Sequence, residues 1–160
     1  MSEYVPDSNS VTALKVPPHS IEAEQLVLGG LMLDDRAWFD LIEILAASDF
    51  YRTQHQIIFE AMTDLANDNA PLDAVTVSER LQSKGLLEKA GGISYLAELA
   101  EATPGTSNIT AYGKIVRDRS VLRQLISFYG DQMQMVLPSY LEHSMALFSK
   151  EQERIREQMT

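Results

Sequence analysis

Apolar residues recur at intervals of three and four positions along most of the chain, which predicts a succession of helices. The first follows a Pro-Pro pair and begins at Ser20, whose hydroxyl suits the capping of a helix N-terminus. Glu22 and Glu24 place negative charge in its first turn, where the helix dipole favours it. Four apolar residues then surround Gly29 and Gly30. We therefore expect a capped, mostly apolar helix over residues 20–33.

The glycine pair is the unusual feature of this helix. Each glycine lowers helix propensity by roughly 1 kcal/mol relative to alanine, so Gly29 and Gly30 need a compensating reason. A second helix that approaches closely at this point supplies one. A phosphate-binding loop is the alternative, but no lysine follows the glycines and no predicted strand precedes them. Close packing is the favoured interpretation.

Four shorter helices are predicted before residue 105, separated by polar or Gly/Pro-containing turns. Thr53 is the expected cap of the second, and Gly85 the left-handed end of the third. The apolar residues that carry the pattern are Trp38, Phe39, Leu41, Ile42 and Leu45; Ile57, Ile58, Ala61, Met62 and Leu65; Val75, Val77 and Leu81; and the inward-facing Ile93, Leu96, Ala97 and Leu99. With no convincing strand, the fold class is all-α, and residues 16–105 form a compact helical head.

A long helix is predicted from residue 106 to residue 137, and Pro138 breaks it before a second helix that extends to residue 160. Both helices carry a coiled-coil seam, with apolar residues at alternating spacings of four and three. The two form either a helical hairpin or an extended association with another chain. The candidate oligomer-interface residues are Ile115, Leu122, Ile126, Tyr129, Met133, Leu141, Met145, Phe148 and Ile155. The same residues could instead be buried in the core of a hairpin, but oligomerisation is the favoured interpretation.

Composition fits a globular protein of 160 residues, 45% of them apolar, which is enough to build a core. Residues 1–15 lack periodicity and are expected to be a disordered tail without the regions of a signal peptide. No apolar run reaches the length of a membrane span, and cysteine is absent. We expect a soluble, cytoplasmic protein that does not interact with membranes.

The charge is −10, and it is unevenly distributed. Residues 112–130 carry four bases and one acid: Lys114, Arg117, Arg119 and Arg123 against Asp118. These bases are the candidate nucleic-acid contacts. The simpler interpretation is a solvated helix face or a partner for the acidic body, because four charges on one helix make a small electrostatic footprint.

No constellation for catalysis or metal binding is visible. His19, His55 and His143 are far apart and have no second histidine at metal-ligand spacing, so they are interpreted as surface or capping residues. No nucleophile is paired with a base, and the Gly-x-x-x-x-Gly-Lys-Ser/Thr pattern of ATP sites is missing. We predict no catalytic, cofactor-binding or metal-binding residues, and hence no enzymatic activity.

The chain resembles a known family over about residues 16–126. Residues 16–25 (VPPHSIEAEQ) and 27–34 (VLGGLMLD), then 49–51 (DFY) with His55 and residues 58–59, look like the start of the bacterial replicative DNA helicase family DnaB. The similarity continues through residues 91–99 (GGISYLAEL), 103–104, 108–109, 111–112 and 115–119 (IVRDR).

The resemblance implies an all-helical head followed by a helical hairpin, which together build the N-terminal collar of a hexamer. That collar docks primase and, in some systems, a helicase loader. In the family the motor is a separate C-terminal RecA-like domain, which this chain is expected to lack. ATP, Mg²⁺ and DNA are therefore expected only at the motor, and the chain by itself is not expected to unwind DNA.

After about residue 126 the pattern changes. Residues 122–134 (LRQLISFYGDQMQ) and 138–159 look like the C-terminal region of the polyhydroxyalkanoate synthesis regulators, the PhaR family. Such a chain is either native or a fusion that joins two families within one helix. The second functional hypothesis is a DNA-binding or oligomerising transcriptional regulator that uses the basic helix at 114–123 and the PhaR-like tail.

Overall fold

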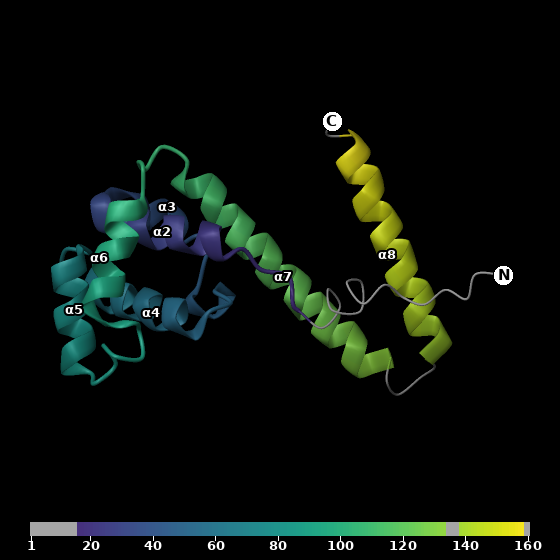
Figure 1. Ribbon diagram of the computed structural model, residues 1–160, viewed down its shortest axis with the longest axis horizontal. Helices are drawn as coiled ribbons and strands as arrows, with labels where there is room; N and C mark the ends of the chain where they lie inside the picture. The colour runs from purple at the N-terminus through teal and green to yellow at the C-terminus, as the bar shows by residue number, and fades with distance from the viewer. Residues whose placement is uncertain (1–15, 134–137, 159–160) are drawn as a thin grey trace. The chain divides into compact units, whose positions relative to one another are not determined.

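In the computed structural model, residues 16–133 and 138–158 are described, and side-chain burial is described for 16–130 and 145–158 (Figure 1). The described residues contain helices and no strand, which confirms the all-α prediction. Residues 1–15, predicted as a disordered tail, lie outside the described part. The elements are α2 (Ile21–Leu33), η1 (Asp35–Ala37), α3 (Trp38–Leu41), η2 (Ala47–Asp49), α4 (Thr53–Asn67), α5 (Ala74–Ser83), α6 (Gly92–Ala102), α7 (Ile109–Met133) and α8 (Pro138–Gln158).

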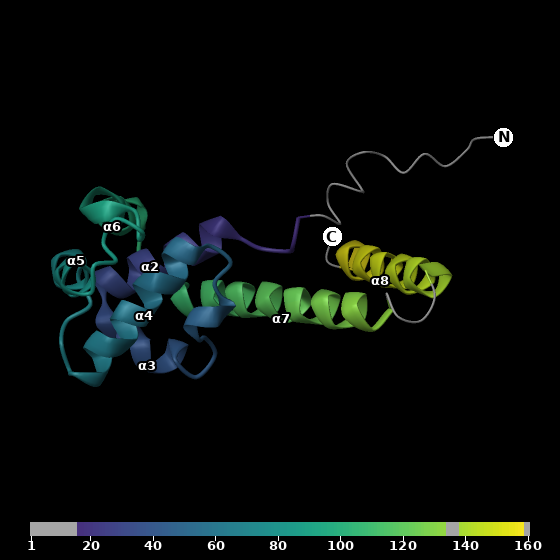
Figure 2. The same cartoon turned by 90° about the horizontal axis from the view of Figure 1, so that it is seen from below.

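The chain divides into two compact units, residues 1–121 and residues 122–160. The first unit, called the head below, contains α2 to α6 and the first half of α7. Helix α2 lies beside α4 and α6, as Figure 1 and Figure 2 show. The second unit holds the end of α7 and all of α8.

Helix α2 begins where the sequence predicts, because the Ser20 hydroxyl accepts a hydrogen bond from the backbone N–H of Ala23 at 3.2 Å. Most of α2 is buried, and the glycine pair explains how its neighbours come so close. A Cβ at Gly29 would collide with Thr103 Oγ1 and the carbonyl oxygen of Leu99, while one at Gly30 would lie 2.7 Å from Ile109 Cδ1. The close-packing interpretation is confirmed.

One prediction about burial is wrong. Ile93, predicted to face inward, is 57% exposed, since α6 begins from two left-handed glycines and buries Leu96 and Leu99 instead. Phe39 and Ile42, which carry the apolar pattern of the short helix, are 75% and 45% exposed, because α3 is a single turn that brings only Trp38 and Leu41 into the core.

The cap of α4 also differs from the prediction. Arg52, not Thr53, occupies the N-cap position, and it makes no side-chain capping hydrogen bond. The Glu24 carboxylate instead accepts hydrogen bonds from the backbone N–H groups of Tyr51 and Arg52, at 2.8 and 3.3 Å. An acid from α2 therefore holds the two residues that lead into α4.

Helix α7 has two separate apolar faces. Ile109, Val116 and Ser120 are buried in the head, and at Gly113 an added Cβ would lie 2.6 Å from Leu41 Cδ2. The predicted seam positions, which include Ile115 and Ile126, fall on a neighbouring face and stay 38% and 44% exposed. None of the described helices is both long enough and apolar enough to cross a membrane.

Candidate functional site

A buried polar network links three helices at the centre of the head. Glu24 on α2 is 1% exposed and His55 on α4 is completely buried. Glu24 Oε1 lies 2.7 Å from His55 Nδ1, and His55 Nε2 lies 2.6 Å from the Tyr95 hydroxyl on α6. The rings of His55 and Tyr95 are stacked, with centroids 5.9 Å apart. The sequence interpretation of His55 as a surface or capping residue is therefore wrong.

Two further side chains meet the Tyr95 hydroxyl in this network. Gln25 Nε2 donates to the Tyr95 oxygen at 3.2 Å, and Arg52 Nη1 lies 3.5 Å from the same oxygen. A carboxylate, an imidazole and a hydroxyl in a row resemble a catalytic triad. Here each group is occupied by another side chain, and the network acts as a structural tie between α2, α4 and α6.

A second buried carboxylate holds α7 to the head. Asp49 is 2% exposed, and its Oδ2 accepts from the backbone N–H of Ala46 at 2.8 Å. Its Oδ1 accepts from Arg117 Nη1 and from the Ser120 hydroxyl, both at 2.7 Å. Among the described residues, every buried side-chain nitrogen and oxygen has a hydrogen-bond partner. Polar contacts inside the head are thus completed within the chain.

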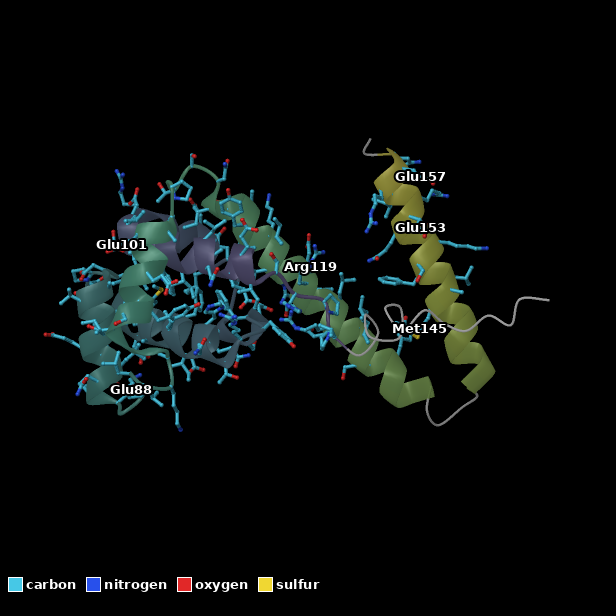
Figure 3. The ribbon with its side chains drawn as sticks, viewed as in Figure 1. Glu88, Glu101, Arg119, Met145, Glu153 and Glu157 are labelled. Atoms are coloured by element: carbon cyan, nitrogen blue, oxygen red, sulfur yellow. The ribbon has the colours of Figure 1, made fainter. Side chains whose placement is uncertain are left out.

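The four nucleic-acid candidates do not form one patch. Arg117 is paired with Asp49, as the interpretation of a partner for the acidic body predicts. Lys114 lies one turn before Arg117, whereas Arg119 and Arg123 lie on roughly the opposite side of α7 by helical geometry. Lys114 and Arg119 are exposed, and Arg123 is half-buried; Arg119 is labelled on α7 in Figure 3. This division does not favour a DNA-binding function for the helix.

The oligomer candidates are mostly exposed. Along α7, Ile115, Ile126 and Tyr129 are 38%, 44% and 53% exposed, and Leu122 is half-buried. On α8, Phe148 and Ile155 are 44% and 51% exposed, and Met145, labelled in Figure 3, is half-buried. The side chains of Met133 and Leu141 lie outside the described residues. The predicted interface stays a prediction.

The seam pattern missed three exposed apolar residues next to it. Leu125, Phe128 and Leu147 are 43%, 59% and 55% exposed. Phe128 also packs edge-on against Tyr129, with ring centroids 5.7 Å apart. A strict alternation of four and three residues selects only a narrow stripe of each helix and leaves these residues out. Their hydrophobicity alone could have indicated them. The apolar face of the second unit is wider than the seam.

The described part of the chain contains no group of three or more histidines and acids that could hold a metal ion. The geometry therefore provides two structural ties in the head and exposed apolar surfaces outside it.

A comparison with known families gives this arrangement its context. The model of the DnaB-like helicase N-terminal domain matches residues 16–118.

This chain belongs to the DnaB-like helicase N-terminal domain family. The replicative DNA helicase DnaB of Haemophilus influenzae is 45% identical over 124 residues, which is 77% of this chain and 26% of that protein. The DnaB of Geobacillus stearothermophilus is 50% identical over 112 residues, 70% of this chain and 25% of that protein. This DnaB domain thus spans about a quarter of the length of these relatives.

Solved structures show the same fold. The N-terminal domain of DnaB helicase from Mycobacterium tuberculosis superposes with a TM-score of 0.72 at 34% identity, covering 84% of this chain and 99% of that one. The corresponding domain from Helicobacter pylori, described with its interactions with primase, gives a TM-score of 0.59 at 21% identity, covering 83% and 97%. The model of the PHB accumulation regulatory domain matches residues 119–156, where the PhaR-like tail was predicted.

Proposed function

We propose that this DnaB N-terminal domain is a non-catalytic assembly and docking module of DNA replication. The domain associates with further copies of itself and binds primase as part of a primosome in the cytoplasm. A helicase loader is a further partner of the same docking role. ATP, Mg²⁺ and DNA are handled by the motor domain of a whole helicase. The family membership supports this role, since the N-terminal domain of the H. pylori relative was described with primase.

The exposed apolar face of α7 and α8 is the observation that carries the assembly role. Tyr129 and Ile155 stay more than half exposed, and Ile126 and Phe148 nearly so. Full burial of an exposed side chain of this kind contributes about 1.5–3 kcal/mol, and because these four are already about half buried, each contributes roughly half of that. Four of them from each of two chains contribute a total similar in size to the cost of association, which is roughly 4–15 kcal/mol. A face of this kind is typical of a protein interface.

The docking role is tested by titration with primase. The primase of H. influenzae is a suitable partner, because the helicase of that organism is 45% identical to this chain over 124 residues. Fluorescence anisotropy of the labelled full chain should rise to saturation as primase is added, and unlabelled chain should compete. The absence of binding at tens of micromolar primase contradicts the docking role and leaves the assembly role to its own test.

A further inference from the structure

The outer side of α3 carries an apolar surface that the head does not use. Phe39, at 75%, has the highest exposure of the large apolar side chains in the described residues, and Ile42 follows one turn later at 45%. Ile42 also lines a depression of about 440 Å³ between the α3–η2 segment and α4. Leu45 and Phe59 contribute apolar lining to the same depression. We call Phe39, Ile42 and this depression the α3–α4 face.

The size of the depression suits an inserted side chain. Ligand pockets in proteins measure about 300–1,000 Å³, so a volume of about 440 Å³ has room for a large apolar residue. Leu45 and Phe59 are almost completely buried beneath it, at 4% and 1% exposure. A guest side chain would therefore rest on a well-packed part of the core. Phe39 does not line the depression, but it precedes Ile42, which does, by one turn and offers a further apolar contact. Large exposed aromatic residues are typical of interface hot spots.

The charges around the α3–α4 face are unbalanced. Its cations are already paired: Arg36 donates from Nε and Nη2 to the Asp34 carboxylate, both at 2.9 Å, and Lys84 is paired with Asp64 at the edge of the depression. Hydrogen bonds from Arg36 hold the pKa of Asp34 below its usual value, as expected for a carboxylate that is paired with this cation.

Three exposed carboxylates on the segments that form this face are not paired with any cation that the structure describes. Asp40 and Glu43 follow Phe39 on α3 and the turn after it, and Glu60 lines the depression. None of the three makes an ion pair or a side-chain hydrogen bond with a described residue. The apolar anchors are therefore accompanied by negative charge that no described cation neutralises.

We propose that the α3–α4 face is a docking site for a segment of another protein that carries one large apolar anchor flanked by Lys or Arg. The anchor enters the depression beside Ile42, and the flanking cations meet Asp40, Glu43 and Glu60. A second copy of this chain fits less well, because a symmetric contact would bring the same carboxylates of both copies together. This surface is distinct from α7 and α8, and it adds a location to the proposed docking role, on which it rests.

The direct test uses a synthetic amphipathic peptide of leucine and lysine as the probe, and a leucine–glutamate peptide of equal length as its control. Titrated into the isotopically labelled full chain, the lysine peptide should shift the amide resonances of α3 and of α4 around Glu60. The control peptide should leave them unchanged. Shifts spread over other acidic surfaces, such as those around Glu88 and Glu101, would overturn the proposal.

Matched variants separate the anchor from the charge. Phe39→Ala should weaken peptide binding by roughly tenfold, the effect of a moderate hot spot, whereas Val75→Ala, at another exposed apolar position, should leave it unchanged. Glu43→Lys with Glu60→Lys should weaken it further, and Glu88→Lys should not. Because these side chains are exposed, circular dichroism should show the same helix content in every variant. Equal affinity for the chain and Phe39→Ala would overturn the proposal.

Two further outcomes distinguish this surface from the general docking role. If primase binds the chain and Phe39→Ala equally well, docking stands and the α3–α4 face is the wrong surface. If primase does not bind but the lysine peptide maps to the face, the surface stands and primase is the wrong partner. A dimer that Phe39→Ala dissociates in the absence of peptide would assign the face to a second copy and overturn the proposal.

Discussion

Glu24 Oε1 lies 2.7 Å from His55 Nδ1, and the two side chains are 1% and 0% exposed. The pair joins the first helix of the head to α4, and the hydroxyl of Tyr95 extends it to α6. Glu24 also accepts hydrogen bonds from the backbone N–H groups of Tyr51 and Arg52, which directly precede α4. One carboxylate thus holds three helices together.

Removing this carboxylate should destabilise the head strongly. Glu24→Ala leaves His55 and two backbone N–H donors without their acceptor, and each buried donor left unsatisfied typically costs about 1–3 kcal/mol. Chemical denaturation followed by circular dichroism measures the change in the free energy of unfolding. Glu22→Ala is the matched control, since that exposed acid contributes at most about 1 kcal/mol through the helix dipole. Equal losses in the two variants would contradict a structural role for the network.

Gly29 of α2 and Gly130 of α7 should respond in opposite directions to alanine. At Gly29 the added Cβ meets the backbone of Leu99, which cannot rotate away, so overpacking should cost about 1–3 kcal/mol. At Gly130 no neighbouring atom of the described residues lies within 4 Å of the added Cβ, so the higher helix propensity of alanine should stabilise by up to about 1 kcal/mol. Thermal unfolding of both variants checks the prediction. A stabilised Gly29→Ala variant would show that α2 and α6 are less closely packed.

Arg117 should matter for stability and Arg119 should not, although both were nucleic-acid candidates. Arg117 donates to the buried Asp49, and losing a hydrogen bond to a charged group costs about 1.5–3 kcal/mol. Partial exposure of Arg117 moves the expected loss toward the lower end of this range. Arg119 is exposed on another side of α7, so Arg119→Ala should change stability by less than about 0.5 kcal/mol. Urea midpoints of the two variants decide the matter, and equal midpoints would contradict the ion-pair role.

The cap of α5 should give a pH-dependent contribution. The backbone N–H and the hydroxyl of Thr76 donate to the Asp73 carboxylate, at 3.0 and 2.8 Å. Both hydrogen bonds hold the pKa of Asp73 below its ordinary value of 3.8. A lowered pKa in the folded state means that the ionised carboxylate stabilises the fold. This contribution is complete above the unfolded-state pKa and is lost as the pH falls through the folded-state value.

Asp73→Ala should therefore cost about 1 kcal/mol near neutral pH, the usual value of a helix N-cap. The difference between the two proteins should hold down to about pH 5 and shrink below about pH 4. Denaturation at a series of pH values provides the measurement. A difference that grows toward acid pH would contradict the assignment of the cap to the ionised form.

The elements built on local chemistry were predictable. Ser20 caps α2 as expected, and the glycine pair marks a close approach because no other reason explains two glycines in an apolar helix. Gly85 ends α5 with a φ of 69°, in the left-handed region that glycine tolerates. The caps at Ser20 and Gly85 depend on residues near in sequence, and the glycine pair marks the place of a close approach without naming its distant partners, Leu99 and Ile109.

The buried network was not predictable in the same way. His55 and Tyr95 are 40 residues apart, and their contact exists only after α4 and α6 have packed. One signal was present, because Glu24 lies three and four residues before Val27 and Leu28 and so shares their buried helix face. The exposure of Phe39 could not be predicted for a related reason. A one-turn helix has too few residues for its apolar spacing to indicate which side faces the core.

The mass of the full chain in solution tests the assembly role most directly. Sedimentation equilibrium at tens of micromolar should show a dimer or a larger species. Ile126→Glu combined with Tyr129→Glu, at exposed positions of α7, should shift the mass toward the monomer without changing helix content. A full chain that is only monomeric at tens of micromolar would contradict the proposed assembly role.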